Sequence, residues 1–296
     1  MQFPTPVGVR FSDGTVRATT SPPETEDFRI GDYTVTEPLG TEEAGEFHLG
    51  EHVVLPRKAA IKVLSLAGGY NRAAAVAMLR EACLVEALVH PGIPRIYECG
   101  VLPDKRPWTA YELVEGASVA TRIAIAPMAL ADVVVLVRDV ADVLDHIHKR
   151  GIVHRQISTE SIVFTPFRRY PLIVRHWGDA CTLDSAGIAA DPRDDVYELG
   201  RVAFLSLTGR RHDGYESCSS ADPHAPRDVT SLIDRMLDQN VTKRPTSSDV
   251  HERGRWLADT LEQVPARPVT RELVPPDVEE VAPGLTLRIA GRTRTR

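Results

Sequence analysis

Long apolar runs, paired metal-ligand cysteines and an excess of basic residues are all missing from this 296-residue sequence. Its most apolar window, residues 129–147, is interrupted by five charged residues, which excludes a membrane span. The net charge of −6 gives no reason to expect nucleic acid as a partner. Since the four cysteines follow no C-x-x-C or Cys/His spacing, we expect free thiols (Cys83, Cys99, Cys181 and Cys218). The first residues show no basic segment followed by an apolar one, so we expect no signal peptide and a cytoplasmic location.

The order of strand-like and helix-like segments indicates an α+β chain in two lobes. Residues 1–30 are interpreted as an N-terminal extension, with a β-hairpin at an Asp-Gly turn and then a linker. Residues 31–115 alternate like strands and contain one Ala/Leu-rich helix at 72–89. Residues 116–263 have a helical pattern, and residues 264–296 are a Pro-rich linker and basic tail that includes one strand-like stretch. In the helical part we expect helices at 129–150, 196–207, 229–239 and 247–260.

Short motifs follow one another across residues 33–256. They are AAIK at 59–62, YELVEG at 111–116, HRQISTESIV at 154–163, HWG at 176–178, DVYELG at 195–200 and KRP at 243–245. In this order and at these spacings they resemble the bacterial serine/threonine protein kinases of the eukaryotic type. The resemblance implies a bilobal protein-kinase-like fold, with a β-rich N-lobe that contains one helix and a helical C-lobe.

The resemblance places Lys62 as the phosphate-binding lysine and Glu81, on the predicted helix, as its ion-pair partner. Lys62 lies in an apolar strand run, and an unpaired buried charge costs several kcal/mol. The pair can therefore survive as a structural strut without catalysis. The alternative is that both are surface charges on a strand and a helix.

The other elements of the nucleotide site are eroded or ordinary. Gly40 and Gly45 stand at the ends of the phosphate loop, but an acidic stretch follows Gly40 and would repel a triphosphate. The resemblance places Glu112 and Val114 in the hinge that would face an adenine, and Tyr111 where it narrows the pocket. These positions form a vestigial nucleotide site together with Lys62 and Glu81.

The positions that would perform the chemistry carry unsuitable residues. By the resemblance, Gln156 replaces the aspartate base, and losing a general base typically costs on the order of 10²–10⁴ in rate. Ser158 replaces a lysine, and Ser161 replaces the asparagine that would hold a metal ion. His176 replaces the metal-binding aspartate, although Mg²⁺ prefers oxygen ligands. Asp179, three residues further on, is the one alternative ligand, but three residues rotate a side chain at a strand end well away from the site, so we do not expect it to replace the aspartate.

The positions that would brace the fold remain in place. The resemblance gives His154, Arg155, Gly178 and Asp195 structural roles, with Asp195 bracing the backbone of the loop at 154–161. Asp195 follows Gly178 by only 17 positions, so the activation segment is shortened. Its A-P-E sequence is missing, so Arg244, which would pair with that glutamate, must find another acceptor or face water.

These substitutions predict a catalytically inactive or severely impaired kinase-like domain, a pseudokinase that acts as a regulatory or scaffolding module in signalling. The alternative is an atypical ATP-dependent serine/threonine kinase, or another nucleotide transferase, that uses Lys62 and Glu81 with rearranged metal ligands. We expect no cofactor, with weak metal-independent ATP binding left open. The expected partner is a protein, such as an active kinase or a phosphothreonine-reading domain.

A third hypothesis places the function in the flanking segments. Phosphorylation there would create docking sites for phosphothreonine-reading domains. The simpler alternative is that these segments are solvated tails. The threonines concerned are Thr19, Thr20, Thr25, Thr293 and Thr295.

Overall fold

The N-terminal half of the fold is an antiparallel six-stranded sheet in the order β1-β2-β3-β4-β6-β5, accompanied by helix α1. The computed structural model describes residues 28–42, 45–66, 69–184 and 190–263. The sheet contains β1 (Arg29–Ile30), β2 (Tyr33–Glu42), β3 (Gly45–His52), β4 (Lys58–Leu64), β5 (Ile96–Val101) and β6 (Pro107–Glu112), and α1 spans Arg72–Glu86.

The tight turn between β1 and β2 depends on a glycine. Gly31 has a φ of +57°, and an added Cβ would lie 2.4 Å from the ring of Trp108. The same region closes a small core in which Ile30, Tyr33 and Ile61 are almost fully buried. The sheet therefore begins at Arg29, two residues before the predicted lobe boundary.

Helix α1 forms where the sequence predicts it, but it ends earlier. The side chain of Asn71 caps its first turn by accepting the N–H groups of Ala73 and Ala74. Its buried face includes Met78 and Val85, which keeps one side of the helix in the core. The predicted end at Val89 is three residues too late.

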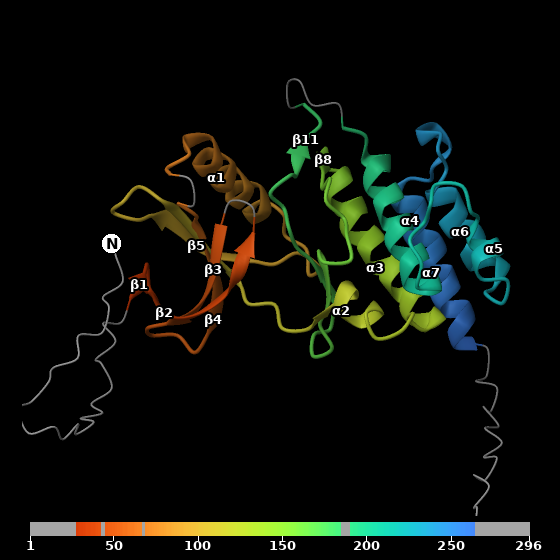
Figure 1. The fold of residues 1–296 in the computed structure, drawn as a ribbon, viewed down its shortest axis with the longest axis horizontal. Helices are drawn as coiled ribbons and strands as arrows, with labels where there is room; N and C mark the ends of the chain where they lie inside the picture. Colours follow the sequence, from red (N-terminus) through yellow and green to blue (C-terminus); the bar gives the residue numbers. More distant parts are fainter. Residues whose placement is uncertain (1–27, 43–44, 67–68, 185–189, 264–296) are drawn as a thin grey trace, which may run out of the picture.

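The C-terminal half is helical, and α3 lies at its centre. Its elements are β7 (Ala117–Ser118), α2 (Val119–Ile123), α3 (Leu130–His148), β8 (Ile152–Val153), β9 (Ile162–Phe164), β10 (Leu172–Val174), β11 (Cys181–Thr182), α4 (Pro192–Thr208), α5 (Cys218–Ala221), α6 (Arg227–Met236), the 3-10 turn η1 (Val241–Lys243) and α7 (Ser247–Gln263). Helix α3 packs against α4 and α7, and Leu136, Leu144 and Ile147 are fully buried in the shared core. Figure 1 shows the sheet and α1 in one half of the molecule and these helices in the other.

The α+β architecture with a β-rich N-lobe and a helical C-lobe is confirmed. The start predicted for α4 was wrong by four residues, because Asp191 caps the helix and Pro192 provides a preformed first turn. The short strand pairs β8–β11 and β9–β10 were not predicted. No helix within the described ranges is long and apolar enough to cross a membrane. The predicted N-terminal hairpin, the C-terminal strand and the five tail threonines lie outside the described residues.

Candidate functional site

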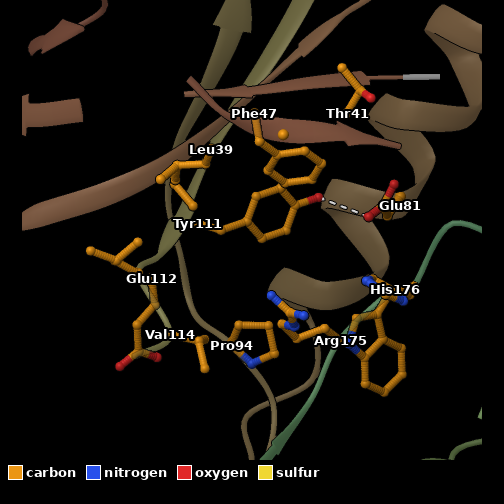
Figure 2. Close-up of a pocket in the computed structure, with 14 residues that line it drawn as sticks. Leu39, Thr41, Phe47, Glu81, Pro94, Tyr111, Glu112, Val114, Arg175 and His176 are labelled. Carbon is orange, nitrogen blue, oxygen red and sulfur yellow. Dashed lines mark hydrogen bonds between the residues drawn. The ribbon is translucent and has the colours of Figure 1, made fainter. Parts of the chain in front are cut away.

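A cavity of about 490 Å³ lies between the two halves of the fold. Its lining comes from β2, β3 and β4 on one side and from the end of β6 and the segment after β10 on the others. Figure 2 shows Phe47 and Tyr111 on one side of the cavity, with Pro94 and Arg175 opposite them.

Lys62 and Glu81 form a buried ion pair beside the cavity. The Nζ atom of Lys62 lies 2.8 Å from Oε2 of Glu81, and less than a tenth of either side chain is exposed. The hydroxyl of Tyr111 donates a hydrogen bond of 3.1 Å to the other carboxylate oxygen of Glu81, as Figure 2 shows. Both oxygens of this carboxylate are therefore engaged. The sequence predicted the ion pair but not the contribution of Tyr111.

The remaining residues of the vestigial nucleotide site divide into two groups. Gly40, Glu112 and Val114 line the cavity, whereas Gly45 and Lys62 are not among its lining residues. Gly45 lies against the aliphatic stem of Lys62, where an added Cβ would be 2.8 Å from Cγ. The nucleotide-binding role predicted for Lys62 stays a prediction.

Asp195 holds the backbone of the loop that follows β8. Its fully buried carboxylate accepts the N–H groups of His154 at 2.8 Å and Arg155 at 2.7 Å. It also lies 2.8 Å from Nε2 of His148. Because burial lowers the pKa of His154 to about 4, this imidazole is neutral at pH 7. The loop backbone is thus fixed by α4, as the resemblance implied.

The serines of this loop are occupied by each other. The Oγ atom of Ser161 accepts the N–H of Ser158 at 2.9 Å and donates to its carbonyl oxygen at 3.1 Å. The Oγ atom of Ser158 in turn accepts the N–H of Ser161 at 3.2 Å. Ser161 is fully buried, whereas Gln156 is exposed. Ser161 therefore closes a turn, and it is not among the residues that line the cavity.

The segment after β10 carries the second predicted metal position. His176 lines the cavity and has a φ of +64°, a conformation that is uncommon for a residue other than glycine. Trp177 is buried, donates its indole N–H to the carbonyl oxygen of Val174 and packs edge-on against His154. Gly178 is the next residue. A Cβ added to it would lie 3.8 Å from Oε2 of Glu81.

Asp179 does not line the cavity. It is exposed and lies in a neighbouring groove beside α1, where its carbonyl oxygen accepts the guanidinium of Arg155 at 3.4 Å. This position agrees with the expectation that Asp179 does not replace the missing metal ligand.

The residues present do not fit a magnesium site. Two carboxylates line the cavity: Glu81 binds Lys62 and Tyr111, and Glu112 lies 2.9 Å from Arg168. No cluster of three or more His, Cys, Asp or Glu that could hold a metal ion occurs among the described residues. We therefore derive no chemical step that uses a metal ion here.

Two residues near the site were not singled out from the sequence. Arg175 lines the cavity and directly precedes His176, and its charge next to the HWG motif was the available signal. Glu198 accepts the N–H of Ile157 at 2.8 Å, and burial raises its pKa to about 7. Its place in the DVYELG motif gave no sign of that contact.

Arg244 has found a replacement partner. Its guanidinium lies 2.8 Å from the carboxylate of Asp194, donates to the carbonyl oxygen of Asp238 and stacks 4.5 Å from the ring centroid of Tyr197. Of the two outcomes expected without the A-P-E glutamate, Arg244 therefore shows the first, because it has another acceptor and does not face water.

Comparisons with known proteins agree with this geometry. Residues 33–173 match the family model described as protein tyrosine and serine/threonine kinase. The chain is 30% identical over 273 residues to the serine/threonine-protein kinase pkn2 of Myxococcus xanthus, covering 78% of this chain and 32% of that protein. It is 29% identical over 198 residues to PknI of Mycobacterium tuberculosis, covering 62% of this chain and 34% of PknI.

The solved structure of the PknI kinase domain superimposes on this one with a TM-score of 0.63 at 25% identity. The match covers 78% of this chain and 98% of that domain. The chain spans about a third of the length of the curated relatives that it matches. The described part of the chain is therefore a protein-kinase-like domain, homologous to the bacterial serine/threonine protein kinases.

Proposed function

We propose that this domain is a pseudokinase, a catalytically inactive or severely impaired kinase-like domain that acts as a regulatory or scaffolding module in signalling. The observation that carries the proposal is the turn formed by Ser158 and Ser161. Its hydrogen bonds use the proton and one lone pair of the one side-chain oxygen at the two predicted metal positions, since the side chain of His176 has no oxygen. The exposed amide of Gln156 cannot replace the missing carboxylate base.

The supporting pattern extends to the bracing residues. Asp195 holds the loop backbone, Arg244 has exchanged its partner for Asp194, and Lys62 and Glu81 are buried together. All of these contacts stabilise the fold without needing a nucleotide. A scaffold that keeps its shape and has no base or metal ligands is suited to binding another protein.

The test is a transfer assay with ATP labelled at the γ-phosphate, in Mg²⁺ and in Mn²⁺, with a basic acceptor protein. The kinase domain of PknI is the positive control, and EDTA is the negative control. We expect no label in the protein or in the acceptor. Metal-dependent transfer at a rate near that of the positive control would refute the proposal.

The buried pair of Lys62 and Glu81 favours one alternative, an atypical ATP-dependent kinase or another nucleotide transferase. Repeating the assay with ATP labelled at the α-phosphate separates the two chemistries. Label from the γ-phosphate alone indicates phosphoryl transfer, and label from the α-phosphate indicates transfer of a nucleotide group.

The partner is proposed to be a protein, either an active kinase or a phosphothreonine-reading domain. Affinity purification of the full chain with mass spectrometry tests this proposal directly. Mass spectrometry of the same preparation shows whether the tail threonines are phosphorylated. If none of them is phosphorylated, the hypothesis that the tails carry the function is refuted.

A further inference from the structure

The segment that connects α1 to β5 is held in a turn by the side chain of a histidine. The N–H of Gly92 donates to Nδ1 of His90 at 3.0 Å, and the N–H of Ile93 donates to the carbonyl oxygen of His90, also at 3.0 Å. Ile93 is buried in the core of the C-terminal half together with Val85 and Leu88. Residues 90–93, which we name the His90 turn, therefore attach α1 of the N-terminal half to the C-terminal half.

The His90 turn also holds the strand that leads to the interlobe cavity. The carbonyl oxygen of Gly92 accepts the N–H of Val174, the last residue of β10, at 2.8 Å. A Cβ added to Gly92 would lie 2.5 Å from Val143 and 2.7 Å from Tyr170, so the backbone is tightly packed here. Pro94, the next residue after the turn, lines the cavity. Opening the turn would therefore loosen both β10 and one wall of the cavity.

The hydrogen bonds of the His90 ring define its protonation state. Because Nδ1 accepts the N–H of Gly92, we assign the ring proton to Nε2, which lies 3.3 Å from Oδ2 of Asp142. The same carboxylate accepts the hydroxyl of Tyr170 at 3.0 Å. The hydrogen bond from His90, more than any other contact, holds the pKa of Asp142 below its usual value. His90 is therefore a neutral imidazole between a backbone N–H and an ionised carboxylate.

Two further histidines belong to this cluster. The ring centroid of His146, on α3, lies 4.9 Å from that of His90, and burial above all lowers the pKa of His146, so this ring stays neutral. His251, on α7, donates from Nδ1 to a backbone carbonyl of α3 at 3.0 Å and places Nε2 3.9 Å from Oδ1 of Asp142. A proton can bind this Nε2 without displacing a hydrogen bond. The other charged groups around the cluster are Arg138, Asp139, Asp145 and Arg150.

His90 differs from the other two, because a second proton on its ring can bind at Nδ1 alone. The proton and the N–H of Gly92 exclude each other there, since both need the same lone pair. The buried N–H of Gly92 would then lack its acceptor, which costs free energy in the closed turn. Asp142 contacts the other side of the ring and leaves this competition unchanged. Lowering the pH therefore favours a protonated ring and an open turn.

We propose that His90 makes the connection between the two halves sensitive to pH: a second proton on Nδ1 displaces the N–H of Gly92, opens the His90 turn and weakens its hold on β10. The inference goes beyond the pseudokinase proposal, since it concerns how the halves are joined and does not depend on whether phosphoryl transfer occurs.

Hydrogen exchange of the full chain, followed by mass spectrometry, tests the proposal at about pH 7.5 and about pH 5.5, on either side of the ordinary histidine value. The rates are corrected for the intrinsic effect of pH on amide exchange. One linked proton that binds at the ordinary histidine value changes an opening equilibrium about tenfold by the lower pH. We therefore expect the protection of peptides that contain Gly92 and Val174 to fall about tenfold, and that of α6 to stay the same.

The substitution His90→Asn keeps an acceptor for the N–H of Gly92, because an asparagine side chain accepts the N–H two residues further on. Since its amide does not bind a proton in this pH range, we expect equal protection at both pH values. The matched control is His224→Asn, which removes an exposed histidine outside the cluster and is expected to show the same fall as the wild type. The fall is also expected to remain in His146→Asn and in His251→Asn. The unfolding temperature of each variant shows that it is folded.

Three results would overturn the proposal. The first is equal protection of Gly92 and Val174 at both pH values in the wild type. The second is a fall that persists in His90→Asn, or that disappears in His146→Asn or His251→Asn, because the proton would then act at another ring. The third needs no variant: nitrogen-15 NMR of the wild type near pH 7.5 is expected to show the His90 proton on Nε2, and a proton on Nδ1 would contradict the competition with Gly92.

Discussion

Replacing Glu81 by alanine removes the carboxylate that binds the ammonium of Lys62. The side chain of Lys62 is buried, with 7% of its surface exposed. The same change removes the acceptor of the Tyr111 hydroxyl. Removing one partner of a buried ion pair destabilises a fold by about 3–5 kcal/mol, because the remaining charge stays out of water. We therefore expect Glu81→Ala to lower the free energy of unfolding by about 4 kcal/mol.

A double substitution separates the cost of an isolated charge from the worth of the pair. Lys62→Met with Glu81→Leu removes both charges and fills a similar volume with apolar atoms. Exchanges of this kind are often neutral or stabilising, but the Tyr111 hydroxyl still loses its acceptor, so we expect the double variant to lose about 1–2 kcal/mol, less than Glu81→Ala. Tyr111→Phe removes one neutral donor to a carboxylate and is expected to cost about 1–2 kcal/mol.

Urea unfolding, followed by tryptophan fluorescence and far-ultraviolet circular dichroism, provides the free energies. Glu86→Ala is the matched control, because Glu86 is an exposed residue of the same helix and its loss is expected to cost less than about 0.5 kcal/mol. A cost below about 1 kcal/mol for Glu81→Ala would refute the interpretation of this pair as a strut. A double variant that loses as much stability as Glu81→Ala would refute the explanation by the uncompensated charge of Lys62.

Three further predictions concern Asp195 and Glu198, which bind the backbone of residues 154–157, and Arg244, which binds Asp194 of α4. Asp195→Ala leaves two loop N–H groups without their acceptor and is expected to cost at least about 3 kcal/mol in urea unfolding, with faster proteolysis at 154–161 as the second readout. Arg244→Leu is expected to cost about 2 kcal/mol, and an unchanged midpoint would contradict the role of its new ion pair. The pKa of Glu198 is raised from 4.5 to about 7, so its stabilising contribution is fully present below pH 4.5 and is lost as the pH rises through 7. Glu198→Gln should remove a fall on the order of 2 kcal/mol across this range, and identical pH profiles would refute the assignment.

Spacing along the chain predicted the parts of the fold that depend on local sequence. The helix at Arg72–Glu86 and the strand at Lys58–Leu64 follow from propensity and apolar pattern, and the 19 positions between Lys62 and Glu81 follow from the motif order. Asp195 was also predicted, because the family resemblance placed it near the start of a long helix and implied that it braces the loop. Element ends were less accurate, since capping residues such as Asp191, which sets the start of α4, decide them.

What the sequence did not reveal depends on contacts between distant segments. Tyr111 reaches Glu81 across 30 positions, and Glu198 reaches the N–H of Ile157 across 41. No periodicity encodes such pairs, because each is set by how two elements pack. The place of Arg175 in the cavity lining was missed for the same reason, since only the folded chain brings the end of β10 to the cavity.

Under the pseudokinase proposal, the turn formed by Ser158 and Ser161 limits how catalytic residues could be introduced. An asparagine at position 161 would have to fit where a fully buried serine makes two hydrogen bonds to the backbone of Ser158. Overpacking of this kind typically costs about 1–3 kcal/mol and shifts the backbone that it meets. The substitutions Gln156→Asp and His176→Asp would supply two carboxylates. The metal ligand expected at position 161 would still be missing. A catalytic base at position 156 and metal ligands at positions 161 and 176 would therefore have to be introduced together with a new backbone turn. The reason is that Ser161 is part of the hydrogen bonding that forms the present turn.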